Sequence, residues 1–209
     1  MTPIAVPLEG GTLITIYGLN FLPSIQYKIT EFGTKIPIDA YISSSEIQLI
    51  APPSSTIGNK SIYLTNNNVD FYQRYDLPIL YYNGLIIHSI TPNQILIGSQ
   101  TIITIKGLDF LSDSRLLNSL KINNTLIPTK FIDVETLTAE LPSFSSLTAE
   151  TKFDVLITIN HQDYYTGLTV TYILPPALVN FTPAFSNSQE QYFSINVTGN
   201  NFLYSNGLQ

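Results

Sequence analysis

One short pattern occurs three times along the chain, and this internal repeat constrains the fold more than any other feature. Each copy is an alternating apolar segment that ends in Gly-x-Asn/Asp-Phe-Leu, and the copies occupy residues 13–22, 102–111 and 194–203. Their glycines, at positions 18, 107 and 199, are 107 − 18 = 89 and 199 − 107 = 92 residues apart. Because a period of about 90 residues is the length of one small domain, the sequence predicts two complete domains and the beginning of a third.

The domain boundaries follow from a Thr-Pro pair that opens each copy, at Thr2, Thr91 and Thr182. We expect three units, over residues 1–86, 87–176 and, incompletely, 177–209. The segments that join them are short and apolar rather than rich in Gly and Ser, so they are poor flexible tethers. Neighbouring domains are therefore expected to pack end to end with restricted bending, as a rod.

Strand patterns dominate the chain, and no stretch of ten residues has the apolar spacing of an amphipathic helix. Ile14 and Ile16 alternate with Thr15 and Tyr17, which is the period of two that places one face of a strand in a core. Such segments recur about seven times per repeat, separated by Pro and Asn-Gly turns. The predicted fold class is all-β, with tandem immunoglobulin-like β-sandwiches arranged end to end.

The amino-acid composition excludes several kinds of site and partner. Apolar residues make up 44% of the chain, so the domains should fold without a metal ion, and the absence of cysteine excludes disulfides and thiolate sites. Only 11% of residues are charged, the net charge is −6 and the basic residues are scattered, so nucleic acid is not an expected partner. No apolar run reaches the roughly 18 residues of a membrane span. A surface of hydroxyls and amides suits contact with sugars or with copies of the same chain.

Catalytic and metal-binding patterns are weak. The only histidines, His88 at the domain junction and His161 in a predicted hairpin turn, lie in different domains, and no Ser-His-Asp spacing is meaningful. Four acidic residues could approach one another, Asp109, Asp113, Asp133 and Glu135, but no Asp-x-Asp-x-Asp-Gly loop accompanies them. We expect a protein that is not an enzyme and that needs no metal ion or other cofactor.

The combined motifs resemble the immunoglobulin-like fold shared by plexins and transcription factors, the IPT/TIG domain. That family's pattern is Ile-x-Pro, a Gly-rich turn, a Thr-x-Ile-x-Gly-x-Asn-Phe strand, a later Ala-Pro and a closing aromatic strand. The matching residues of the first copy are Thr2, Pro3, Gly10, Gly11, Thr12, Ile14, Ile16, Gly18, Asn20, Phe21, Ala51, Pro52 and Tyr82. Those of the second copy are Ile90, Pro92, Gly98, Thr101, Ile103, Ile105, Gly107, Asp109, Phe110, Pro142 and Tyr172.

Three residues of each copy, nine in all, are expected to build the same structural turn. The glycines, Gly18, Gly107 and Gly199, are predicted at a positive φ or at a bulge. The short polar residues, Asn20, Asp109 and Asn201, can bond the turn backbone. The aromatic residues, Phe21, Phe110 and Phe202, are predicted to anchor the turn in the sandwich.

Two further groups are candidate surface sites. Asn-x-Ser/Thr sequons occur at Asn59, Asn123, Asn180 and Asn196, and they would carry N-linked glycans if the chain is secreted. About three sequons are expected by chance in so Asn-rich a chain, so their number alone does not indicate secretion. Tyrosines cluster near the ends of both domains, at Tyr72, Tyr75, Tyr81, Tyr82, Tyr164 and Tyr165. They predict a contact surface, with core packing as the alternative.

The resemblance implies two classes of function. Rel-like transcription factors use such a domain to dimerise and touch DNA, whereas plexins and other surface proteins carry tandem copies in extracellular stalks. The tandem arrangement and the acidic balance favour an extracellular or cell-surface structural and adhesion protein, a rod that forms a filament or stalk. The alternatives are a receptor ectodomain that binds a protein or carbohydrate, and an accessory module of a larger extracellular enzyme.

The incomplete third copy supplies apolar residues without a closed core, among them Phe193, Ile195, Val197 and Phe202. About thirty residues of this kind should not stay ordered alone. We expect either a continuation of the same chain or a neighbouring subunit to cover them. Self-association or contact with neighbouring repeats is thus the expected partnership.

Overall fold

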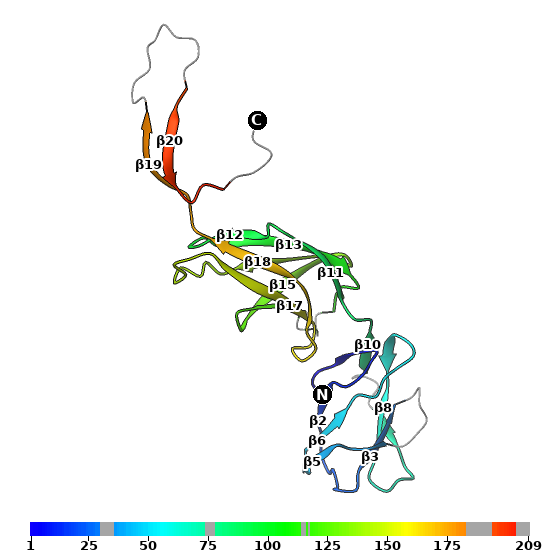
Figure 1. The fold of residues 1–209 in the computed structure, drawn as a ribbon. Coiled ribbons are helices and arrows are strands. Elements are labelled where there is room, and N and C mark those ends of the chain that lie inside the picture. The colour runs from blue at the N-terminus through cyan, green and yellow to red at the C-terminus, as the bar shows by residue number, and fades with distance from the viewer. Residues whose placement is uncertain (30–35, 74–77, 114–115, 117, 183–193, 204–209) are drawn as a thin grey trace.

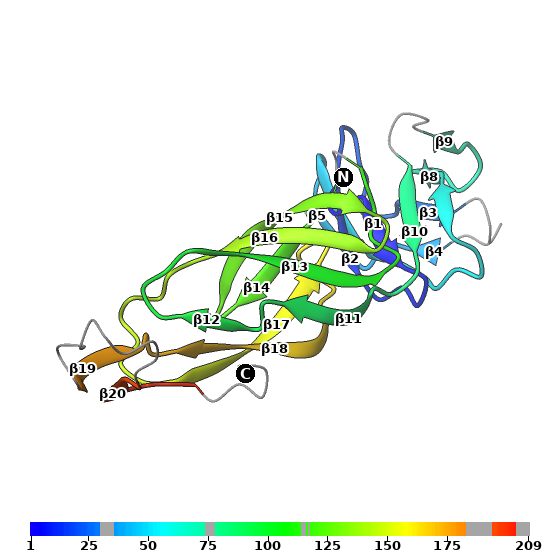
Figure 2. The same ribbon diagram turned by 90° about the horizontal axis from the view of Figure 1, so that it is seen from above.

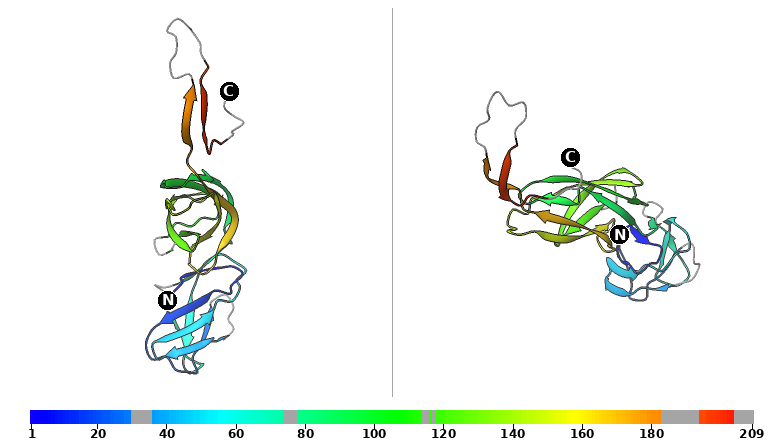
Figure 3. Two further views of the ribbon diagram at one scale, coloured as in Figure 1. Left: turned by 60° about the vertical axis from the view of Figure 1, so that its left-hand side comes forward. Right: turned by 45° about the horizontal axis from the view of Figure 1, so that its top comes forward.

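The computed structural model describes residues 1–29, 36–73, 78–113, 116, 118–182 and 194–203. Every regular element in these ranges is a β-strand, which confirms the predicted all-β class. Figures 1 and 3 show two sandwiches that follow one another along the chain, with a two-stranded hairpin beyond the second.

The first sandwich consists of short strands in three sheets, with the orders β1-β10-β7, β2-β6-β5 and β4-β3-β8-β9. The strands are β1 (Ala5–Pro7), β2 (Leu13–Tyr17), β3 (Gln26–Ile29), β4 (Ile36–Pro37), β5 (Ala40–Ser43), β6 (Glu46–Ile50), β7 (Gly58–Lys60), β8 (Ile62–Thr65), β9 (Tyr72–Gln73) and β10 (Ile79–Tyr82). Alternation places Ile14 of β2 and Leu49 of β6 in the core, both fully buried.

The second sandwich is one continuous sheet of eight strands, in the order β11-β13-β16-β15-β14-β17-β18-β12, folded into two layers (Figure 2). The strands are β11 (Ile86–Thr91), β12 (Gln94–Leu96), β13 (Thr101–Leu108), β14 (Ser119–Ile122), β15 (Thr125–Asp133), β16 (Thr136–Leu141), β17 (Thr151–Thr158) and β18 (Tyr165–Ile173). β15 joins the layers because its first half pairs with β14 and its second half with β16. Each sandwich has its own apolar cluster, and the cluster of the second also includes Ala5 and Tyr82 of the first.

The third copy forms a hairpin of β19 (Ala177–Thr182) and β20 (Asn196–Asn200). Its apolar side chains remain half exposed, at 52% for Ile195 and 48% for Val197, because no second layer lies against them among the described residues. The predicted core residue Phe193 falls outside the described ranges.

The segments that join the copies consist largely of strands, which the sequence analysis did not predict. β11 pairs antiparallel with β13, and β19 pairs in the same way with β20. Only the stretch from Asn83 to Leu85 therefore connects the two sandwiches outside a strand. Five short strands were also not predicted. β1 runs parallel to β10, β12 runs parallel to β18, and the other three are β5, β7 and β9 of the first sandwich.

The structural turn differs in one respect from its prediction. The positive φ lies at Asn20 (61°), Asp109 (64°) and Asn201 (60°), two residues after each glycine. The glycines are required for space instead, since a Cβ on Gly107 would lie 2.7 Å from Phe110 Cζ and overlap the carbonyl oxygen of Ile86. A bulge does occur in the second and third copies, but in the opposite strand, at the register shifts beside Gly107 and Gly199.

Candidate interface between the repeated domains

The joint between the sandwiches is formed by residues 158–165, the connection from β17 to β18, which we call the clamp loop. Asn160 organises it: its Oδ1 accepts hydrogen bonds from the backbone N–H groups of Gln162 (3.0 Å) and Asp163 (2.9 Å). Its Nδ2 donates to Asp163 Oδ2 (2.5 Å) and across the joint to the Ala5 carbonyl (3.0 Å). Asn160 is only 5% exposed, so the side chain that shapes the loop also attaches it to the first sandwich.

Two more side chains of the clamp loop reach the first sandwich. The Thr12 hydroxyl donates to Asp163 Oδ2 over 2.7 Å, and Gln162 Nε2 donates to the Leu13 carbonyl over 3.0 Å. Thr12 is only 2% exposed. Its bond to Asp163 is expected to be one of the stronger contacts of the joint, because a hydrogen bond to a carboxylate is stronger than one between neutral groups. The clamp loop thus holds the beginning of the first sandwich at three positions that are about 150 residues away in sequence.

An aromatic pair closes the other side of the joint. The rings of Tyr82 and Tyr165 lie edge to face, with centroids 6.5 Å apart, and Tyr82 is 2% exposed. A Cβ on Gly84 would lie 3.1 Å from Tyr165 Cε1, so a glycine lets the chain pass close to that ring. Burial and then the neighbouring Tyr165 raise the pKa of the Tyr82 hydroxyl well above its ordinary value of 10. In the described part of the chain, that hydroxyl has no hydrogen-bond partner of ordinary geometry.

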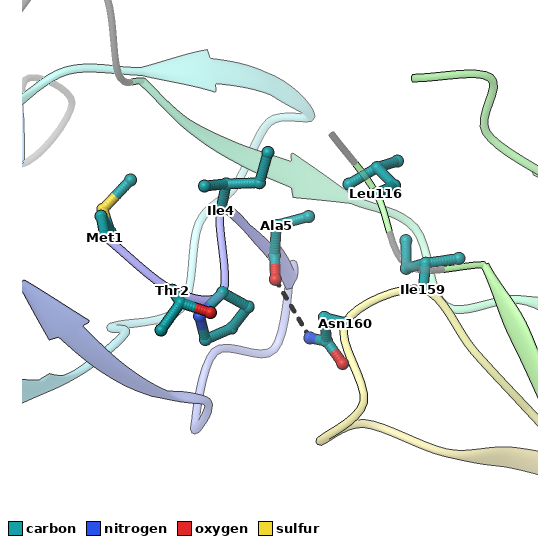
Figure 4. Close-up of a pocket in the computed structure, with 8 residues that line it drawn as sticks. Met1, Thr2, Ile4, Ala5, Leu116, Ile159 and Asn160 are labelled. Carbon is teal, nitrogen blue, oxygen red and sulfur yellow. Dashed lines mark hydrogen bonds between the residues drawn. The ribbon is translucent and has the colours of Figure 1, made fainter. Parts of the chain in front are cut away.

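A small pocket of ≈130 Å³ lies within the joint (Figure 4). Its walls come from both sandwiches: Met1, Thr2, Pro3, Ile4 and Ala5 from the first, and Leu116, Ile159 and Asn160 from the second. The hydrogen bond from Asn160 to Ala5 crosses beside it. Sites for drug-sized ligands occupy about 300 Å³ or more, so this space is a packing gap at the interface.

The predicted tyrosine surface is divided by the structure. Tyr81 and Tyr82 are buried and do not belong to a surface, which corrects that part of the prediction. Tyr81 donates its hydroxyl hydrogen to the Pro52 carbonyl (2.9 Å), as Tyr172 does to Pro142 (2.9 Å), so Tyr81 and not Tyr82 is the counterpart of Tyr172. The remaining members are distributed as follows: Tyr164 and Tyr165 are half-buried, Tyr72 is 75% exposed, and Tyr75 lies outside the described residues.

All four sequon asparagines are exposed. Asn59 lies in β7, and Asn123 lies in the turn between β14 and β15. Asn180 and Asn196 lie on the third-copy hairpin. Their side chains are accessible to a glycosyltransferase, and their occupancy stays a prediction.

The groups considered for catalysis or metal binding do not gather in one place. His161 has φ 61° in the clamp loop, and its Nε2 lies 2.9 Å from Ser119 Oγ. His88 is exposed on β11. No group of three or more His, Asp or Glu side chains within the described ranges could hold a metal ion. In those same ranges, no helix is long and apolar enough to cross a membrane.

The joint residues were missed by the sequence analysis, although a signal for them exists. The pattern Thr-x-Asn-x-x-Asp followed by two aromatic residues begins at Thr158 and also at Thr65. A repeated pattern at the end of the same strand in each copy indicates a common loop, but it does not reveal what the loop contacts.

Tandem sandwiches joined by a strand and a clamp loop define an immunoglobulin-like repeat protein. The sequence profile of the IPT/TIG domain matches residues 1–79 and 85–172, and the chain belongs to this family.

Curated relatives include plexins. The chain is 29% identical over 109 residues to Plexin-2 of Caenorhabditis briggsae, covering 52% of this chain and 6% of the relative. It is 33% identical over 91 residues to Plexin-2 of Caenorhabditis elegans, covering 43% of this chain and 5% of the relative. Among solved structures, the full extracellular region of plexin A4 matches with a TM-score of 0.50 and 16% identity, over 85% of this chain and 16% of that one. This last likeness shows the fold alone, and the chain spans only about a twentieth of the curated relatives.

Proposed function

We propose that this chain is a non-catalytic, extracellular or cell-surface segment that works as a stiff spacer with adhesive surfaces. The observation that carries the proposal is the joint: residues that could have been a tether form β11, and the clamp loop holds the first sandwich from the other side. We retain the division into residues 1–86, 87–176 and 177–209 as the units of the spacer.

The stiffness has a physical basis. A hinge needs residues that can change φ and ψ freely, and only Asn83, Gly84 and Leu85 lie between β10 and β11. Leu85 is buried in the cluster of the second sandwich together with Ala5 and Tyr82 of the first, so bending would expose apolar surface. Hydrogen bonds at three positions then fix the rotation of one sandwich about the other.

The location rests on different support. The curated relatives that the chain matches are plexins, and the resemblance to plexins implies a cell-surface setting. The exposed sequons suit a glycosylated surface, so glycans at Asn59, Asn123, Asn180 and Asn196 are part of the proposal. Mass spectrometry of the chain purified from its natural source should find glycosylated peptides, and four unmodified asparagines would contradict this part.

A receptor ectodomain is the second candidate, favoured by the plexin relatives. The two candidates share the spacer role for the sandwiches. They differ in whether another part of the protein binds a ligand. The scattering experiment described next tests the spacer role and therefore applies to both candidates.

Small-angle X-ray scattering of the dilute chain tests the spacer. The wild type should fit one fixed arrangement of the two sandwiches. Asn160→Ala/Asp163→Ala should broaden the distribution of distances between them, because it removes the clamp. The matched control is Asn67→Ala/Asp70→Ala, which makes the same changes in the equivalent loop outside the joint and should leave the scattering unchanged. Equal effects of both pairs, or a wild type that fits only a freely hinged ensemble, would refute the proposal.

A further inference from the structure

We infer that Ser119 and Lys121 of β14 are positioning residues of the joint, which hold the clamp loop in the shape that binds the first sandwich. They act through the clamp loop and not as partners of the first sandwich. The inference rests on the proposed spacer role and deepens it, because it names the residues on which the stiffness of the joint depends.

The clamp loop folds back over the outward face of its own sheet. In β14, Leu120 and Ile122 are fully buried in the core, so the alternate residues Ser119 and Lys121 lie on the other face. Thr158, the register partner of Ser119 at the end of β17, lies on that face too. Yet Ser119 is only 7% exposed and Thr158 is fully buried. Polar residues buried on an outward face need a cover, and their hydrogen bonds identify that cover as the clamp loop.

His161 is the residue at which the loop turns over this face. Its φ of 61° is one that residues other than glycine rarely adopt, so its neighbours must stabilise it. Its N–H donates to Thr158 Oγ1 (2.8 Å), its carbonyl accepts from the Tyr164 hydroxyl (3.2 Å), and its Nε2 lies 2.9 Å from Ser119 Oγ. Of these three partners only Ser119 lies outside the clamp loop, so it ties the turn to β14.

Lys121 fastens the other end of the loop. Its ammonium nitrogen lies 5.2 Å from the centroid of the Tyr164 ring, within the distance at which a cation is attracted to the face of an aromatic ring. Tyr164 directly precedes Tyr165, whose ring packs edge to face on Tyr82 of the first sandwich. The contact at Tyr164 therefore sets the place from which Tyr165 reaches the joint.

The residues of the clamp loop are divided between two surfaces. Asn160, Gln162 and Asp163 bind the first sandwich. His161 and Tyr164 contact β14 instead. Because the contacts on β14 order the binding groups before they meet the first sandwich, less conformational entropy is lost when the joint forms. Removing those contacts should thus free the joint, even though every hydrogen bond across it retains its donor and acceptor.

The first sandwich contains a similar arrangement outside the joint, which provides a matched control. Lys28 of β3 has the same register as Lys121, and its ammonium nitrogen lies 4.1 Å from the centroid of the Phe71 ring. Gln26 takes the place of Ser119. Changes at Gln26 and Lys28 therefore parallel changes at the positioning residues, on a loop that does not belong to the joint.

NMR of the full chain tests the inference with two readouts. The first is hydrogen exchange of the Gln162 and Asp163 amides, which bond within the clamp loop. The second is the set of residual dipolar couplings from both sandwiches. Ser119→Ala/Lys121→Met should speed the exchange at least about tenfold and should divide the couplings between two alignment tensors of different magnitude. A merely structural role in the second sandwich would lower its stability without changing the alignment, so the couplings decide.

Three further variants complete the experiment. The control Gln26→Ala/Lys28→Met should leave both readouts unchanged. Lys121→Arg keeps a cation over the ring and should behave as the wild type. Tyr164→Leu removes the ring and should loosen the joint without any change in β14. Circular dichroism melting verifies that each variant is folded, and Tyr164→Leu supplies the result if the double variant is not.

The outcomes separate the inference from the proposed function. A single alignment tensor in the folded loop variants would overturn the inference, and so would an equal effect of the control pair. In both cases the spacer role stands, because the wild type still behaves as one rigid body. Two tensors of different magnitude in the wild type would refute the proposed function and this inference with it.

Discussion

The second and third copies contain the same turn in two different environments. Gly107 and Gly199 lie under the rings of Phe110 and Phe202, and the residues before those rings have φ values of 64° and 60°. Yet Phe110 is 1% exposed and Phe202 is 53% exposed. Four residues and one opposing strand are thus enough to set the turn, whereas burial of its aromatic residue requires the remaining strands of a sandwich.

The paired strands repeat this difference. Ile103 and Ile105 of β13 are fully buried, whereas Ile195 and Val197 at the equivalent positions of the third copy are about half exposed. Since the alternation is the same, the hydrophobic contribution of this segment depends on what covers it and not on its sequence.

The largest expected effect comes from removing the buried ring. Phe110→Ala should lower the free energy of unfolding of the second sandwich by about 3–5 kcal/mol, because it leaves a cavity in a closed core. Phe202→Ala should leave that free energy nearly unchanged, since Phe202 is half exposed outside both cores. Chemical denaturation followed by circular dichroism measures both. Similar losses from the two substitutions would contradict the comparison.

The next effect concerns the glycine beneath the ring. Gly107→Ala should cost about 2–3 kcal/mol, because the new methyl group meets a strand carbonyl that cannot move away. Gly18→Ala should cost less, as its contacts are atoms of the Phe21 ring. Gly199→Ala should leave both sandwiches unaffected. The same denaturation experiment ranks the three, and a different order would show that the glycines serve another purpose.

A smaller effect is expected from alkaline pH, which should lower the free energy of unfolding of the two complete sandwiches. Burial raises the pKa of Tyr172 to about 12, and burial and then Asp39 raise that of Tyr27 to about 12. The unfolded value is near 10, so the folded chain holds these protons longer. Their contribution to stability is complete below pH 10 and is lost as the pH rises towards 12. Denaturation midpoints should therefore fall over this range, and Tyr172→Phe should reduce the fall in the second sandwich. A flat profile from pH 10 to 12 would contradict this expectation.

The smallest expected effect on stability comes from removing a tyrosine hydroxyl at the joint, compared with removing one in a core. Tyr82→Phe should change stability by less than about 0.5 kcal/mol, because the hydroxyl that it removes is buried without a partner of ordinary geometry in the described residues. The matched control, Tyr81→Phe, removes the hydrogen bond to Pro52 and should cost about 1 kcal/mol. If Tyr82→Phe proves the costlier of the two, the joint contains a bond that this account omits.

Alternation and turn chemistry made the strands and the sandwich class predictable from the sequence. The repeated polar residue before Phe21, Phe110 and Phe202 marked each turn correctly, but its left-handed φ was assigned to the glycine. The glycine is needed because a Cβ at its position would overlap the opposing strand or the phenylalanine ring. A local sequence pattern does not indicate such a contact across the sheet. Similarly, β11 has no clear alternation because a bulge interrupts its pairing with β13 between Ile87 and Ser89.

The joint was beyond sequence reasoning for a related reason. Asn160 and Ala5 are 155 residues apart, and neither residue type indicates an interdomain contact. Two adjacent tyrosines, Tyr81 and Tyr82, likewise cannot reveal from sequence that one faces its own core and the other the neighbouring domain. Only the repeat at Thr65 and Thr158 was visible in advance, and its meaning required the structure.

The most direct test of the account is the relative orientation of the two sandwiches in solution. Residual dipolar couplings of backbone amides, measured by NMR on dilute chain, report how each sandwich aligns. The account predicts that both sets fit one alignment tensor of equal magnitude and that Asn160→Ala/Asp163→Ala separates them into two. Two tensors of different magnitude in the wild type would show that the clamp loop does not hold the joint.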